Sequence, residues 1–222
     1  MKIFLSHSLN NNTPTYGNRS RVSVSKIKSI KEGSTVNEST INLPLHCGTH
    51  IDFPHHFFSE KITQENYEAD FWFFNKPIII EVEQSELIID EKIIDQLKQV
   101  KDKASFDILL VKTGATAFRS ESRYWEYNYG LSPNVADYLK EEFTSIRVVG
   151  MDFISLSSYQ HSDAGKAAHY HFLDPKSPIL VIEDMDLTKV DANTTLREVI
   201  VCPLRIDGTD GVPVTCFGIT ED

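Results

Sequence analysis

The chain has 222 residues, of which 41% are hydrophobic and 24% are charged. This composition excludes a disordered chain and suffices for one large domain or two small ones. The formal net charge of −10 disfavours nucleic-acid binding, which usually requires a basic surface. No apolar run reaches the ~18 residues of a transmembrane helix, and the apolar part of the N-terminal segment is too short for a secretory signal. Three widely spaced cysteines predict no disulfide framework and suit a reducing cytoplasm.

Residues 1–60 predict short β-strands. Residues 2–6 (KIFLS) form a short apolar run, and residues 21–27 (RVSVSKI) alternate between apolar and polar side chains. Residues 40–47 (TINLPLHC) also alternate, which predicts a strand with one apolar face. That predicted face contains Ile41, Leu43, Leu45 and Cys47.

From residue 77 onward, strand and helix patterns alternate. Asp90 is the predicted N-cap of a helix with apolar residues at helical spacing. Ser132 followed by Pro133 is a typical helix start. Strands are predicted at 77–83, 106–114, 146–153 and 178–184, two more within 198–219, and helices at 90–100 and 131–143. We expect an α/β fold, a single domain over residues 1–222 with a mixed β-sheet or flattened barrel and helices packed outside.

Histidines are concentrated in residues 43–58 (LPLHCGTHIDFPHHFF). Four of the eight histidines, with one aspartate, lie within eleven residues. In an extended segment, residues two apart share a face, so His46, His50 and Asp52 would project together. Two imidazoles and a carboxylate are a common ligand set for zinc or manganese in hydrolases. The spacing predicts a divalent metal site, and a histidine-rich corner without metal is the alternative.

The neighbours of these three residues carry secondary predictions. Gly48 would leave room for an ion and a water, and Cys47 faces the other way as a buried filler. Pro44 and Pro54 each remove a backbone donor, which favours a strand edge or a loop beside a cavity. His55 is interpreted as a flank of the motif, and His7 has no partner visible in sequence.

The segment HCGTHIDFPHH, from His46 to His56, resembles the signature His-x-Gly-Thr-His-x-Asp-x-Pro-x-His at every fixed position. This is the signature of the cyclase-like metal hydrolases, the family of bacterial kynurenine formamidases and isatin hydrolases. Later segments, including LLVKTG, VVGMDF and PLRIDGTDGVPV, are similar to the family's later blocks in the same order. The resemblance implies a swivelling β/β/α fold.

The resemblance also implies roles for individual residues. It assigns the first metal ligands to His46, His50 and Asp52 and the catalytic histidine to His56. A second ion, where present, would be held by Asp52 with a later histidine and glutamate. These map onto His169 and Glu183, with His171 as a rival ligand because Tyr170 replaces the usual arginine and the following loop is longer. His161 would line the cavity or cap a loop.

The implied chemistry is hydrolysis. One or two divalent ions, zinc or manganese, would lower the pKa of bound water, and His56 would transfer protons. An aryl formamide such as N-formylkynurenine is the expected small-molecule substrate, and a cyclic amide or lactone is the closest alternative. A non-haem metal oxidoreductase and a non-catalytic metal-binding module are the alternatives from other classes. Tyr16, Phe57 and the aromatic run 71–74 would shape a pocket, although a core or subunit contact explains that run better. A homo-oligomer, a dimer or tetramer, is expected from the resemblance.

Overall fold

The computed structural model describes residues 1–83 and 86–221. The strands of its main sheet are β1 (Lys2–Phe4), β4 (His50–Asp52), β5 (Phe73–Phe74), β6 (Pro77–Glu81), β8 (Ile108–Lys112), β10 (Val148–Met151), β11 (Leu180–Glu183), β12 (Leu196–Pro203) and β13 (Gly211–Thr220). Two small sheets pair β2 (Ser23–Lys28) with β3 (Glu38–Asn42) and β7 (Ile88–Ile89) with β9 (Gly130–Leu131). The α-helices within these residues are α1 (Glu91–Gln99), α2 (Arg123–Glu126), α3 (Pro133–Glu142) and α4 (Ser162–Phe172).

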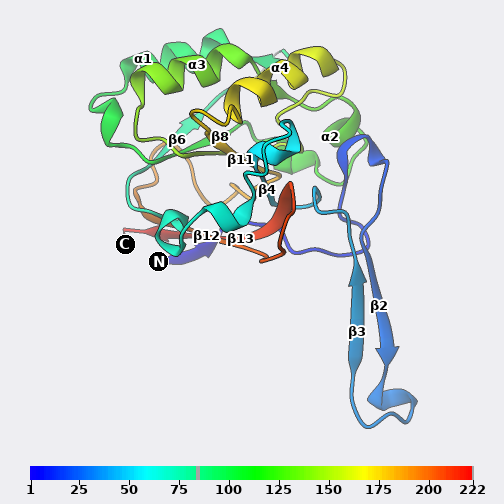
Figure 1. Cartoon of the computed structure of the whole chain (residues 1–222). Helices are drawn as coiled ribbons and strands as arrows, with labels where there is room; N and C mark the ends of the chain where they lie inside the picture. Colours follow the sequence, from blue (N-terminus) through cyan, green and yellow to red (C-terminus); the bar gives the residue numbers. More distant parts are fainter. Residues whose placement is uncertain (84–85, 222) are drawn as a thin grey trace.

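The main sheet is mixed, with the strand order β5-β12-β13-β4-β11-β10-β8-β6, and β1 pairs with β13. β6 at one end of this order contacts β12 near the other end, so the sheet curls into a nearly closed barrel. Helices α1, α3 and α4 lie together over one side of the sheet (Figure 1). The expected α/β class, with a mixed sheet and helices outside, is confirmed.

The parallel half of the sheet contains β6, β8, β10 and β11. Helices α1, α3 and α4 connect these strands in chain order, as parallel strands require. All of β10 and β11 is buried, as is β8 apart from Lys112. Strands covered on both faces have continuous apolar sequences, which is why they were recognisable in the sequence.

Helices α1 and α3 begin at the predicted positions, but only one of the two predicted caps makes a capping hydrogen bond. The Ser132 hydroxyl accepts a hydrogen bond from the Asn134 amide, 3.2 Å away, with Pro133 in the first turn. Asp90 occupies the predicted N-cap position of α1, but its side chain makes no capping bond and instead accepts from the Asn134 side-chain amide. None of the helices in 1–83 and 86–221 has the length and hydrophobicity to cross a lipid bilayer.

The strand predicted at 40–47 is wrong beyond Asn42. β3 ends at Asn42, and Ile41 is 47% exposed, so the predicted apolar face does not form. The chain then bends through Gly48, whose φ of +60° favours glycine. A Cβ on Gly48 would lie 2.4 Å from Leu9 Cδ2. Gly48 is therefore required by the bend and by the close approach of Leu9, and it also lines the cavity that contains His46 and His50.

The short strand β4 lies in the middle of the sheet, which contradicts the predicted edge or loop. Asp52 is paired with Val181 of β11 on one side and Gly211 of β13 on the other. Pro44 and Pro54 flank β4 without belonging to it, so neither removes one of its ladder donors. The prolines limit the strand's length but do not determine its place in the sheet.

The aromatic run 71–74 belongs mainly to the core. Trp72 and Phe74 are buried, Phe71 packs partly against the core, and Phe73 is 45% exposed. The interpretation of this run as core packing explains three of its four side chains.

Candidate metal centre

β4 directs His50 and Asp52 to the same side of the sheet, because residues two apart in a strand share a face. His50 Nδ1 donates to the Gly48 carbonyl, 2.9 Å away, which leaves Nε2 as the atom free to bind a ligand. Nε2 is buried and has no hydrogen-bond partner. It lies 3.5 Å from an Asp52 oxygen and 3.3 Å from a Glu183 oxygen. A buried imidazole nitrogen facing two carboxylates fits a divalent cation.

Glu183 reaches this point from β11, where the register pairs it with His50. Its Oε1 accepts hydrogen bonds from the Leu156 amide at 2.6 Å and the Ser155 hydroxyl at 3.2 Å. These bonds fix the carboxylate and leave Oε2 facing His50. Glu183 is 4% exposed, and burying its carboxylate is unfavourable unless a positive charge lies nearby.

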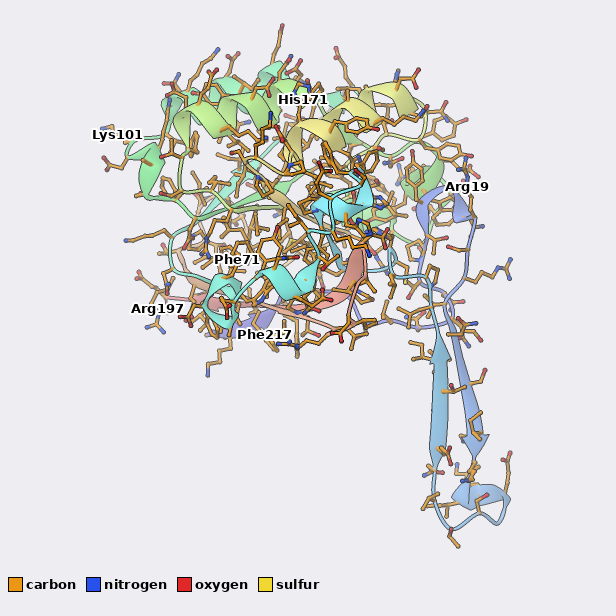
Figure 2. The ribbon with its side chains drawn as sticks, viewed as in Figure 1. Arg19, Phe71, Lys101, His171, Arg197 and Phe217 are labelled. Atoms are coloured by element: carbon orange, nitrogen blue, oxygen red, sulfur yellow. The ribbon has the colours of Figure 1, made fainter. Side chains whose placement is uncertain are left out.

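Helix α4 supplies His169 and turns His171 away. His169 is buried, and its Nδ1 donates to the Gly165 carbonyl at 2.8 Å. Its Nε2 lies 3.6 Å from Asp52 and 3.7 Å from Glu183. His171, labelled in Figure 2, has a 43% exposed side chain that pairs with Asp137. Residues two apart lie on nearly opposite sides of a helix, so only one of these histidines can face the sheet.

His46 and His56 lie at the more open side of the cluster. Their rings stack with centroids 4.1 Å apart. His46 Nδ1 is 2.9 Å from an Asp52 oxygen, and His46 Nε2 and His56 Nδ1 are each 2.9 Å from the same oxygen of Asp210. The structure thus brings together the six predicted site residues, His46, His50, Asp52, His56, His169 and Glu183.

Asp210 was missed by the sequence analysis. It lies 154 residues after His56, in the segment PLRIDGTDGVPV, which resembles a block of the family but received no site residue from the sequence. Its backbone carbonyl accepts a hydrogen bond from Phe53, which docks the turn beside β4. Asp210 is one of several aspartates near the C-terminus, and nothing in the local sequence distinguishes it from an aspartate in a turn.

Two groups of possible ligands share Asp52. His46, Asp52 and His56 form one group, and His50, Asp52 and Glu183 form the other. Within each group the ligand atoms lie within 4.8 Å of one another. The shared carboxylate makes the cluster suitable for one ion or for two neighbouring ions.

The charges of the cluster are strongly coupled. Burial opposes protonation of His46, but Asp52 and Asp210 outweigh it and raise the pKa of His46 to about 10. Burial likewise opposes protonation of His169, and the neighbouring carboxylates of Asp52 and Glu183 raise its pKa to about 9. Burial would raise the pKa of Asp52, but the histidines hold it well below its usual range. Without a metal ion, protonated histidines supply the positive charge that the carboxylates require.

The cluster opens into a cavity of about 310 Å³. Tyr16, Phe57 and Ile154 contribute apolar walls, as predicted for Tyr16 and Phe57. Phe57 also stacks on His169, with ring centroids 4.4 Å apart. The aromatic run 71–74 and His161 are not among the lining residues, and His161 lies at the N-cap position of α4. A larger cavity of about 730 Å³, lined in part by His7 and Asp186, contains none of the cluster's ligands.

A second buried ion pair supports the cluster from behind. Asp184, which follows Glu183, is paired with Arg119 through two hydrogen bonds of 2.7 and 2.6 Å. The Tyr124 hydroxyl donates to the same carboxylate, and the Thr49 hydroxyl donates to the Asp184 carbonyl. These contacts connect the residues beside His50 and Glu183, and hold β4 and β11 in register.

Comparison with known proteins gives consistent results. A family model described as "Putative cyclase" matches residues 3–158. Cyclase-like protein 2 of Oryza sativa subsp. japonica is 25% identical over 197 residues, covering 86% of this chain and 68% of that protein. The kynurenine formamidase of Bacillus cereus is 28% identical over 217 residues, covering 96% and 94%. Isatin hydrolase A from Labrenzia aggregata, solved with benzyl benzoate, has a TM-score of 0.80 at 19% identity, covering 100% of this chain and 94% of that chain.

Proposed function

The chain belongs to the putative cyclase family, and from this premise we propose that it is a metal-dependent hydrolase of a small amide. The observation that carries the proposal is the unpartnered, buried Nε2 of His50, which faces carboxylate oxygens of Asp52 and Glu183. Such an atom is costly to bury unless it binds a cation or a proton.

The proposed ligands are His46, His50 and Asp52 for a first ion, and Asp52, His169 and Glu183 for a second. Their nitrogen and carboxylate donors suit zinc or manganese. When bound, such an ion supplies Lewis acidity and a water of lowered pKa. The hydrogen bonds from His50 to Gly48 and from His169 to Gly165 fix which ring nitrogen each histidine presents.

His56 is proposed as the proton-transfer residue. Its Nδ1 donates to Asp210, which leaves Nε2 to accept a proton from water and to pass it to the leaving nitrogen. Asp210 would act as a positioning residue, because a carboxylate on Nδ1 selects the tautomer and stabilises the protonated ring. The stacking of His56 on His46 restricts its orientation further.

For the substrate, we propose an aryl formamide such as N-formylkynurenine, which would make the protein an arylformamidase-like enzyme. The proposal is supported by the likeness to a kynurenine formamidase along nearly the whole of both chains. The cavity of about 310 Å³ with Tyr16 and Phe57 in its walls suits a small aromatic molecule. A cyclic amide or lactone is the alternative within the same chemistry.

The proposal also covers the domain organisation, the cellular location and the oligomeric state. We propose that residues 1–222 act as one hydrolase domain in the cytoplasm, where the three free cysteines would stay reduced. A homo-oligomer, dimer or tetramer, is included in the proposal.

The test is a substrate panel assayed for both hydrolysis and oxygen consumption. N-formylkynurenine is tried first, followed by lactams, lactones and simple esters, with protein loaded with zinc or manganese. Hydrolysis without oxygen uptake supports the proposal. Oxygen-dependent turnover would identify an oxidoreductase, and metal binding without turnover of any substrate would leave only a metal-binding module.

A further inference from the structure

A cavity of about 230 Å³ lies next to the candidate metal centre, and its described lining residues include none of the cluster's ligands. Five aromatic side chains and one arginine form most of its wall: Phe118, Arg123, Tyr124, Tyr127, Tyr129 and Phe153. We call it the aromatic cavity. They come from η7 (Ala115–Phe118), α2, the segment between α2 and β9, and the segment after β10. Its volume is below the about 300–1,000 Å³ of typical small-molecule sites, which limits a ligand to about one ring.

Arg123 gives the aromatic cavity a positively charged side. Its guanidinium carbon lies 3.8 Å from the centre of the Phe118 ring, which restricts its orientation. Its Nε pairs with Glu121 at 2.9 Å, but the two side chains are 55% and 54% exposed, and such a pair is weak. Among the described residues that line the cavity, none is acidic. The charge therefore favours an anionic ligand, and the planar guanidinium fits a carboxylate.

The aromatic side chains favour a flat ring as the other part of the ligand. Tyr129 and Phe153 meet edge to face, with ring centroids 6.3 Å apart. Phe153 is fully buried and Tyr127 is 59% exposed, so the aromatic wall extends from the core to the surface. Aromatic rings gain more from stacked and edge-on contacts with one another than from buried area alone. An aliphatic ring of the same size lacks this contribution.

We propose that the aromatic cavity is a second binding site, that its ligand is a single-ring aromatic carboxylate, and that the bound ligand steadies the segment that positions Glu183. The ring of the ligand packs against the tyrosine and phenylalanine side chains. Its carboxylate accepts hydrogen bonds from the Arg123 guanidinium in competition with Glu121.

The wall of the aromatic cavity continues directly into the candidate metal centre. Phe153 lines the aromatic cavity, whereas the next two residues, Ile154 and Ser155, line the cavity of the metal centre. The Ser155 hydroxyl and the Leu156 amide donate the hydrogen bonds that fix the Glu183 carboxylate. A ligand that packs on Phe153 therefore restricts the segment that holds this carboxylate.

Two polar side chains in the wall provide further connections. Asn128 is 4% exposed, and its side-chain amide donates to the Ser157 carbonyl at 2.7 Å. Ser157 lines the cavity of the metal centre. The Tyr124 hydroxyl donates to Asp184, the residue after Glu183. Ordering of these side chains by a ligand is thus transmitted through packed and hydrogen-bonded groups to both sides of the cluster.

The first test titrates the full chain with benzoate and measures binding by calorimetry or ligand-observed NMR. A dissociation constant on the order of 1 mM or below is expected for so small a ligand. Benzylamine, which lacks the negative charge, and cyclohexanecarboxylate, which lacks the aromatic ring, should each bind at least about fivefold more weakly. No benzoate binding up to about 10 mM, or equal affinity for either control compound, would overturn the proposal.

Variants of exposed side chains locate the binding site. Arg123→Gln and Tyr127→Ala should each keep the fold and weaken benzoate binding by at least about fivefold. Tyr127→Phe retains the ring and should bind benzoate as the wild type does. Arg197→Gln makes the same charge change at an exposed position of β12 and should leave the affinity unchanged. Equal affinity in all four variants would place benzoate elsewhere, the metal centre included, and would overturn the proposal.

Hydrogen exchange tests the connection to Glu183 without requiring a metal ion or turnover, so its outcome is independent of the proposed function. Saturating benzoate should slow amide exchange in residues 153–157, which include the Leu156 amide bonded to Glu183, by at least about threefold. Exchange in β12 should not change. At the same benzoate concentration, Arg123→Gln should show less slowing because less ligand is bound. Unchanged exchange in 153–157 at saturation, or equal slowing in Arg123→Gln, would overturn the proposed connection.

Discussion

β3 and β4 are separated by seven residues in the chain, yet they have opposite environments. All five residues of β3 are exposed in the projecting hairpin of β2 and β3, and all three residues of β4 are buried at the candidate metal centre. β4 is paired on both sides and surrounded by fixed polar groups, whereas β3 is paired only with β2. The comparison shows that the neighbours supplied by the fold determine which of two short strands is buried.

The largest effect is expected from His50→Ala. It removes an imidazole whose ring is fixed by Gly48 and which faces Asp52 and Glu183, so metal binding and hydrolysis should be lost together. His171→Ala is the matched control, because that histidine is on the surface and should leave both unchanged. Metal content, activity and circular dichroism of the two purified variants provide the comparison. Full metal content in folded His50→Ala protein would remove His50 from the ligand set.

His56→Ala is expected to separate chemistry from metal binding. His56 is held by Asp210 at the open side of the cluster, so the variant should keep its metal while turnover falls by about 10²–10⁴-fold. The measurement is kcat with a working substrate, alongside metal content. If metal is lost as completely as in His50→Ala, His56 is a ligand, and unchanged turnover would make it a bystander.

A buried ion pair and an exposed ion pair should contribute differently to the free energy of unfolding. The Arg119–Asp184 pair is largely buried, so Arg119→Met leaves an uncompensated carboxylate and should cost about 3–5 kcal/mol of unfolding free energy. In the hairpin of β2 and β3, Lys28 and Glu38 are both about half exposed, and Lys28→Met should cost about 0–1 kcal/mol. Denaturant unfolding at one fixed protein concentration measures both. Equal costs would contradict the proposed difference between the two regions.

A pH dependence of metal uptake is also expected. Metal ligands must be neutral imidazoles, but carboxylate neighbours raise the pKa of His46 to about 10 and that of His169 to about 9. Both rings therefore carry a proton at pH 7 that a metal ion must displace. For each such proton, the metal affinity is expected to fall about tenfold when the pH falls by one unit. Calorimetric titration in buffers of different ionisation enthalpy should detect proton release, and constant affinity between pH 6 and about 8 would argue against it.

The sequence predicted the fold where patterns are local. The continuous apolar runs around Ile108–Val111 and Leu180–Glu183 identified buried parallel strands, because such strands are covered on both faces. The alternation at 21–27 did not distinguish a half-buried strand from an exposed hairpin, since both alternate. Only the strand's neighbours in the fold make that distinction.

Some residues of the candidate site could be predicted from the sequence, and others could not. His50 and Asp52 share a face for the reason inferred from their spacing, whereas the extended segment did not reach back to His46, which approaches Asp52 after the bend at Gly48. Asp210 could not be identified, because its pairing with His56 arises from the pairing of β13 with β4. Long-range partners of this kind leave no mark in local sequence.

The most direct test of the central claim is the metal content of the wild-type protein, purified without chelators and then titrated with zinc and manganese. The account predicts one or two tightly bound divalent ions per chain, because Asp52 lies beside His46, His50 and His169 and is shared by the two proposed ligand sets. A folded wild-type chain that neither retains nor takes up a divalent ion would contradict the account.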